Sequence, residues 1–75
     1  MMAAGSSVYR VIEVIGVSPK SWEDAAAAAV KTASGSLRDL RVAEVTKLDV
    51  TVEGGKIASY RARLNLSFKY EGGRT

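Results

Sequence analysis

The stretch "SYRARLNLSFKY", residues 59–70, decides the fold, because its residues alternate between apolar and polar almost without exception. Alternation with a period of two is typical of a β-strand that buries one face and exposes the other. The predicted dry face carries Tyr60, Ala62, Leu64, Leu66, Phe68 and Tyr70, and the predicted wet face carries Ser59, Arg61, Arg63, Asn65, Ser67 and Lys69. The dry face requires a covering helix, and the wet face presents two arginines to solvent or to a ligand.

The stretch "RVAEVTKLDVTVEGGKIASY", residues 41–60, predicts a second strand that is joined to the first by a hairpin. Adjacent glycines tolerate positive φ, so "EGG" at 53–55 is the predicted turn. The apolar series falls at odd positions up to Val45 and at even positions from Leu48 on. Its residues can share one dry face only if one extra residue is inserted near Thr46–Lys47, as at a β-bulge. With that bulge, the wet face of this strand carries Val42, Glu44, Lys47, Asp49 and Thr51.

Two further elements precede the hairpin. The segment "SVYRVIEVIGVS" is rich in β-branched residues and predicts a strand over roughly residues 7–16, ending at Gly16. Residues 18–40 change to a helical period, and Ser21 followed by Asp24 predicts the N-cap of a helix. The predicted helix face, with Gly35 inside its pattern, carries Trp22, Ala26, Ala29, Val30, Ala33, Leu37 and Leu40. We expect Trp22, at the helix start, to pack on the sheet or on a neighbouring copy.

The predicted order is β-α-β-β, an α+β fold in which a three-stranded antiparallel sheet is partly wrapped around one helix. We expect a single domain over residues 1–75, with loose tails at residues 1–6 and 72–75. A helix of about 17 residues spans roughly 25 Å, whereas a strand of about 14 residues spans roughly 45 Å. The helix therefore leaves part of the dry face uncovered, and another copy of the chain is the expected cover.

The composition narrows the function. The 75 residues include no Cys and no His, which excludes disulfides and the commonest zinc ligands and leaves self-association as the expected support for a small core. The net charge of +3 is modest and the cations alternate with carboxylates, so we expect no nucleic-acid partner. No apolar run approaches membrane-spanning length and no signal peptide is evident, so we expect a cytoplasmic protein. No residue pattern indicates a catalytic group, and we expect no enzymatic activity.

The segments "VYRVIEVIGVSPKSWEDAA", "SLRDLRVAEV" and "EGGKIASY", with "LSFKYE" at the end, resemble the dodecin family in order and spacing from Val8 to Glu71. This resemblance implies a small β-α-β-β subunit that closes into a hollow homododecamer. It also implies that the wet face of the sheet helps to line flavin pockets at contacts between subunits, with riboflavin or FMN as the expected cofactor.

The sequence departs from the typical family site in several linked positions. Flavin-binding members have a Trp followed by an aromatic residue where this chain has Val42 and Ala43, and that Trp stacks on the flavin ring. They have a Gln at the position of Arg61 and a His at that of Ser59, and their "RGH" is replaced by "DVT" at 49–51. A lost aromatic stack costs about 1 kcal/mol per face and a mismatched hydrogen bond about 1–3 kcal/mol. We therefore predict that flavin binding is weakened or lost.

Three hypotheses for the ligand stay open. In a shell that binds or stores a small molecule, the candidate ligand-binding residues, which match the family's flavin site, are Val42, Arg61 and Arg63. In a calcium-binding shell, Asp49 and Glu53 are the candidate metal ligands, although two carboxylates per chain suffice only if symmetry brings copies together. In a purely structural assembly, the arginines pair with carboxylates such as Glu44 and Asp49 and hold no ligand.

Overall fold

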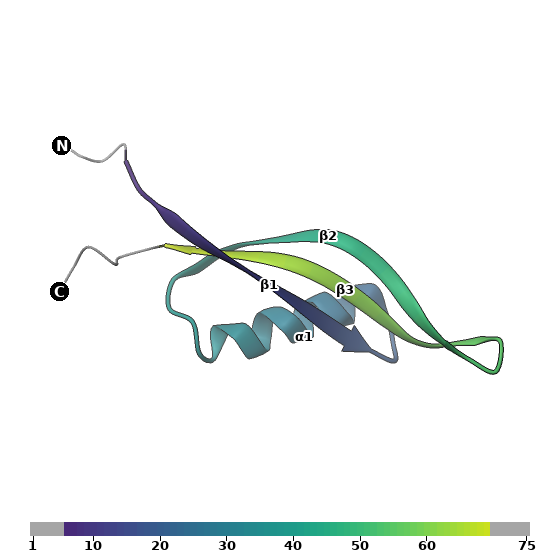
Figure 1. Cartoon of the computed structure of the whole chain (residues 1–75). Helices are drawn as coiled ribbons and strands as arrows, with labels where there is room; N and C mark the ends of the chain where they lie inside the picture. Colours follow the sequence, from purple (N-terminus) through teal and green to yellow (C-terminus); the bar gives the residue numbers. More distant parts are fainter. Residues whose placement is uncertain (1–5, 70–75) are drawn as a thin grey trace.

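The computed structural model describes residues 6–69 and confirms the β-α-β-β order (Figure 1). Its elements are β1 (Tyr9–Ser18), α1 (Trp22–Ser34), β2 (Leu40–Glu53) and β3 (Lys56–Lys69). The sheet is antiparallel with the strand order β1-β3-β2. The strongly alternating strand, β3, is therefore the central one, and both of its edges are hydrogen-bonded to neighbours.

The core lies between β3 and α1. The fully buried or nearly buried residues are Ala62, Leu64 and Leu66 of β3 and Ala25, Ala29 and Ala33 of α1. The dry face of β3 is thus confirmed from Ala62 to Leu66, whereas Tyr70 lies outside the described residues, as do the predicted tails apart from Ser6. The helix contributes only alanines to this core, because small side chains let the helix axis lie close to the sheet.

The hairpin and the bulge are confirmed. Gly54 and Gly55 have φ values of 58° and 77°, which fits a tight hairpin turn between Glu53 and Lys56. The pairing of β2 with β3 shifts between Val45 and Lys47, where the change of parity predicted a slip. Two further shifts, which the sequence did not indicate, lie between Leu40 and Val42 and between Thr51 and Val52.

The helix begins at the predicted N-cap. The Oγ of Ser21 accepts a hydrogen bond from the Asp24 N–H at 3.0 Å. The carboxylate of Asp24 in turn accepts a hydrogen bond, at 2.6 Å, from the buried hydroxyl of Ser18, whose Oγ accepts one from the Lys20 N–H at 2.9 Å. These contacts join the last residue of β1 to the first turn of α1 and fix the direction of the turn between them.

The helix ends earlier than predicted. It stops at Ser34, and Gly35 is its C-cap, with its N–H donating to the Thr32 carbonyl at 3.2 Å. Leu37 packs on the core from the following loop and Leu40 is the first residue of β2, so neither continues the helix face. The longer helix was a wrong prediction, because apolar spacing does not distinguish a helix from a loop that returns to the same core. Among the described residues, no helix is long and apolar enough to cross a membrane.

β1 does not stop at Gly16, as predicted, but continues to Ser18. A Cβ at Gly16 would lie 2.0 Å from the Ala25 carbonyl oxygen and 3.0 Å from the Ala29 Cβ. The glycine therefore marks the closest approach of helix and strand and not the end of the strand.

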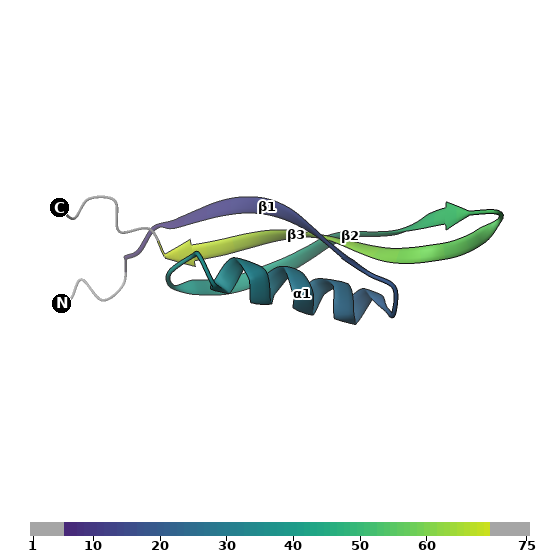
Figure 2. The same cartoon turned by 90° about the horizontal axis from the view of Figure 1, so that it is seen from below.

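The helix covers β1 and β3 but leaves most of β2 and the hairpin uncovered. Its 13 residues span about 20 Å, whereas the molecule is 58 Å long, and the hairpin extends well past the helix (Figure 2). Leu48 is 49% exposed although Ala62, its register partner on the same side of the sheet, is fully buried. We define the apolar strip as the exposed residues Val45, Leu48, Val52 and Ile57.

Candidate functional site

The face of the sheet opposite α1 carries the charged ladder of β2 and β3, and we call it the charged face. Its register pairs are Glu44 with Asn65, Lys47 with Arg63, Asp49 with Arg61, and Thr51 with Ser59. The predicted wet face of these two strands is therefore confirmed. Along β1 the same face is apolar, since Val11, Ile15 and Val17 are exposed beside Ser67, Arg63 and Arg61.

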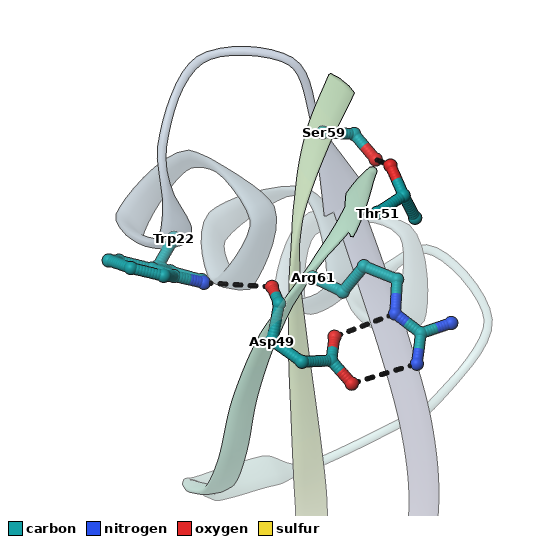
Figure 3. Close-up of polar contacts among 5 residues, drawn as sticks. All are labelled: Trp22, Asp49, Thr51, Ser59 and Arg61. Carbon is teal, nitrogen blue, oxygen red and sulfur yellow. Dashed lines mark hydrogen bonds and ion pairs between the residues drawn. The ribbon is translucent and has the colours of Figure 1, made fainter. Parts of the chain in front are cut away.

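Asp49 and Arg61 form a two-pronged ion pair on this face (Figure 3). The Nε of Arg61 donates to Oδ1 of Asp49 at 2.7 Å and its second terminal nitrogen donates to Oδ2 at 2.9 Å, so both carboxylate oxygens are engaged. The pKa of Asp49 is lowered, mainly by the hydrogen bonds from Arg61. Partial desolvation opposes this shift, and the positive charges of Arg61, Arg63 and Lys47 add to it. The same hydrogen bonds raise the pKa of Arg61. The pair stays open to solvent, with 43% of the Asp49 side chain exposed.

Two hydroxyl groups follow the ion pair along the charged face. The Oγ1 of Thr51 and the Oγ of Ser59 lie 2.6 Å apart and share a hydrogen bond (Figure 3). Asp49, Thr51 and Ser59 therefore place a carboxylate and two hydroxyl oxygens on neighbouring pairs of one ladder. Oxygen donors of this kind are what calcium prefers, but one carboxylate in one chain is too few for its six to eight ligands.

Trp22 holds the main chain of Asp49 from outside the sheet. Its indole Nε1 donates to the Asp49 carbonyl oxygen at 3.0 Å, and its ring meets that of Tyr60 edge to face with centroids 5.2 Å apart. Trp22 packs on the sheet as predicted. The hydrogen bond to Asp49 was not predicted, because the two residues are 27 positions apart and no local pattern links them.

Arg63 has a partner that the sequence did not identify. Its guanidinium lies 3.5 Å from a carboxylate oxygen of Glu13 on β1, and its carbonyl oxygen accepts a hydrogen bond from the Thr46 hydroxyl at 3.2 Å. Glu44, which the sequence offered as a partner, is instead opposite Asn65. Alternation within β1 places Glu13 on the same face as the apolar Val11 and Ile15, and only the strand order β1-β3-β2 brings that face beside Arg63.

Val42, which the resemblance predicts to match a flavin-stacking position, is 53% exposed on the charged face opposite Ser67. Arg61 lies six residues before Ser67 on β3, so the two candidate ligand-binding positions are about 20 Å apart along the sheet. One chain therefore does not bring Val42 together with Arg61. Any pocket that uses both positions requires more than one copy.

The two candidate metal ligands are also separate within one chain. Asp49 and Glu53 are four residues apart on β2, about 13 Å along the strand, and Glu53 is opposite Lys56 at the hairpin. Within residues 6–69, no group of three or more carboxylate, His or Cys side chains is arranged to hold a metal ion. A calcium site that includes Asp49 would have to take further oxygens from other copies or from water.

One helix laid across an antiparallel β1-β3-β2 sheet, with an ion-paired face on the other side, defines a class of small β-α-β-β proteins whose sheet is only partly covered. Within this class, the chain belongs to the dodecin family, whose family model, Dodecin, matches residues 8–71. The family resemblance seen in the sequence is thereby confirmed.

Two relatives show how close the similarity is. Calcium dodecin of Mycobacterium tuberculosis is 51% identical over 63 residues, which are 84% of this chain and 89% of the relative. The crystal structure of that calcium-chelating antigen, described as having a novel calcium-binding site, matches with a TM-score of 0.78 at 46% identity over 92% of this chain and 99% of its own. Dodecin from Streptomyces coelicolor matches with a TM-score of 0.84 at 39% identity, over 89% of this chain and 96% of its own.

Proposed function

We propose that this chain assembles into a hollow homododecamer and binds calcium ions at sites completed by several copies, each of which contributes Asp49. The observation that carries the proposal is the position of Asp49, a solvent-accessible carboxylate beside two hydroxyl groups on the charged face. The similarity to calcium dodecin supports this choice of ligand. A non-catalytic role, a cytoplasmic location and independence from nucleic acid remain predictions from the sequence.

The exposed apolar surface of one copy supports the proposed assembly. The apolar strip lies on the helix side of the sheet, and Val11, Ile15 and Val17 are exposed on the other side. Exposed apolar residues along both faces of a two-layer molecule are typical of an interaction surface. Burying them against other copies offsets the small core of a 75-residue chain.

Flavin is a poor fit to the same face. Val42 has no ring to stack on the isoalloxazine, and the guanidinium of Arg61 is bound to Asp49 and has only donors to offer. We therefore expect the assembly to bind a small ligand, as the family does, but with calcium in place of flavin.

A structural assembly without a ligand is the second candidate, and the ion pairs favour it. Asp49 with Arg61 and Glu13 with Arg63 already neutralise each other within one chain. Arginines that are already paired in this way need no ligand for their stability.

Calorimetric titration of the purified assembly with Ca²⁺ separates the two candidates, with Asp49→Asn as the matched variant and light scattering as the check on size. We expect saturable binding that Asp49→Asn removes, and no comparable heat from riboflavin or FMN. Saturable binding that is the same in Asp49→Asn would show that the site lies elsewhere. No binding to the intact assembly would favour the structural role.

A further inference from the structure

The two carboxylate oxygens of Asp49 cannot chelate a metal ion together while Arg61 holds both of them, because the guanidinium occupies the lone pairs that chelation needs. Arg61 takes both oxygens, at 2.7 and 2.9 Å, through its Nε and one terminal nitrogen. A hard cation binds the same lone pairs at closer range and with the same requirement for negative charge. The observed pair is therefore incompatible with full coordination of a cation by Asp49.

We propose that Arg61 is an internal competitor for the cation site, so that a cation is chelated by both oxygens of Asp49 only when the Arg61 guanidinium leaves them. This inference rests on the proposed calcium function and adds its regulation: the affinity of the shell for calcium is set by the strength of the Asp49–Arg61 pair.

The geometry allows this exchange without rearrangement of the fold. The side chains of Asp49 and Arg61 are 43% and 35% exposed, so the guanidinium can turn into solvent without becoming buried. The main chain at Asp49 is held separately, by the hydrogen bond from the Trp22 indole at 3.0 Å and by the pairing with β3. Opening is therefore a change of the Arg61 rotamer, and the Asp49 backbone stays in place.

The competition has a defined direction. Only the open state, in which Arg61 has left Asp49, can bind the cation fully. The apparent affinity for the cation is therefore reduced by the fraction of chains in which the pair is open. By linkage, a cation that occupies Asp49 releases Arg61 to the same extent. Removing the guanidinium should thus tighten cation binding, whereas removing Asp49 should abolish it.

Terbium luminescence tests the proposal in the assembled full chain. Tb³⁺ is a hard cation that prefers oxygen ligands and emits when a nearby indole absorbs light, and the indole of Trp22 donates a hydrogen bond to the main-chain carbonyl of Asp49. We expect Arg61→Gln to bind Tb³⁺ about tenfold more tightly than the unmodified chain, because a charge-assisted pair is removed. Added Ca²⁺ should reverse the emission, and light scattering should show that the assembly is intact.

Arg63→Gln is the matched control. It removes the same charge from the same face two residues away, but Arg63 pairs with Glu13 and makes no hydrogen bond with Asp49. We expect its Tb³⁺ affinity to change by less than about threefold, since only a screened surface charge is lost. Arg61→Lys keeps the charge but not the two-pronged geometry, so its affinity should lie between those of the unmodified chain and Arg61→Gln.

The outcomes separate this inference from the function on which it rests. Equal affinities of the unmodified chain and Arg61→Gln, both lost in Asp49→Asn, would overturn the competition and leave the cation site standing. Equal tightening by Arg61→Gln and Arg63→Gln would reduce the effect to general charge and also overturn it. If neither the unmodified chain nor Arg61→Gln binds a cation, or if Asp49→Asn binds as well as they do, both proposals fail. If Arg61→Gln does not assemble, Arg61→Lys takes its place: tighter Tb³⁺ binding than in the unmodified chain supports the competition, and equal binding overturns it.

Discussion

The indole of Trp22 and the main-chain carbonyl of Asp49 are joined by a hydrogen bond of 3.0 Å between the start of the helix and the free edge of β2. On the charged face the carboxylate of the same Asp49 is held by Arg61. One residue thus links the helix, the edge strand and the central strand. Contacts at the edge strand matter in this molecule because α1 leaves most of β2 uncovered.

Trp22→Phe removes this hydrogen bond but keeps an aromatic ring for the edge contact with Tyr60. We expect the free energy of unfolding to fall by about 1 kcal/mol, the usual net value of one neutral hydrogen bond. Denaturant titration followed by circular dichroism, at fixed protein concentration, measures the change. Tyr60→Phe, which keeps both rings and leaves the indole bond intact, should change the stability by much less, and an equal loss in both variants would contradict this interpretation.

Gly16→Ala tests the close approach of β1 to α1. The added Cβ would lie 2.0 Å from the Ala25 carbonyl oxygen, so strand or helix must move, and we expect a loss of about 3 kcal/mol or more, or failure to fold.

The control is Gly35→Ala, since Gly35 has a helical φ of −71° and an added Cβ meets nothing closer than 3.4 Å. That substitution should be neutral or stabilise by about 0.5–1 kcal/mol through the unfolded chain. Similar destabilisation at both positions in thermal melts would show that steric contact is not the cause.

The lowered pKa of Asp49 predicts an acid-sensitive contribution to stability. A carboxyl group whose pKa is lower in the folded than in the unfolded chain stabilises the fold above its unfolded value, ordinarily 3.8, and this contribution is lost as the pH falls through the folded value. Asp49→Asn should therefore lower the melting temperature near neutral pH and lower it less as the pH falls below about 4. Melting curves of both proteins against pH measure this, and curves that stay parallel throughout would argue against the pair as the source.

Leu48→Lys places a charge in the centre of the apolar strip. If other copies cover the strip, the substituted chain should form smaller particles, and its melting temperature should depend more strongly on dilution. Light scattering at micromolar concentration gives the mass. Lys31→Glu, on the exposed side of α1, is the control and should leave the particle size unchanged. A particle that is unaffected by Leu48→Lys would mean that the strip lies outside the interfaces.

Val42→Trp combined with Arg61→Gln should tighten flavin binding, measured as quenching of riboflavin fluorescence. The two positions are about 20 Å apart in one chain, so they can act on one ring only across a contact between copies. We expect the double variant to bind more tightly than the sum of the single effects predicts. Strict additivity, or sub-micromolar flavin binding by the unmodified chain, would contradict this account of the lost site.

Much of the fold could be predicted because local patterns have few solutions. The period of two in β3, the parity change near Thr46 and the paired glycines of the turn each allow one arrangement of strand, bulge and hairpin. The end of the helix was not predictable in this way, because Leu37 continues the apolar spacing while its backbone has already left the helix.

The sequence by itself determined which side chains share a face, since alternation along a strand places each residue on one side of the sheet or the other. It thereby placed Asp49, Arg61 and Arg63 together on the charged face. Only the tertiary structure decided the partners: Glu13 reaches Arg63 because β1 lies against β3, and Trp22 reaches Asp49 because the helix starts beside the edge of β2. The physical reason is that a face follows from local backbone geometry, whereas a partner depends on strand order and packing between residues far apart in the chain.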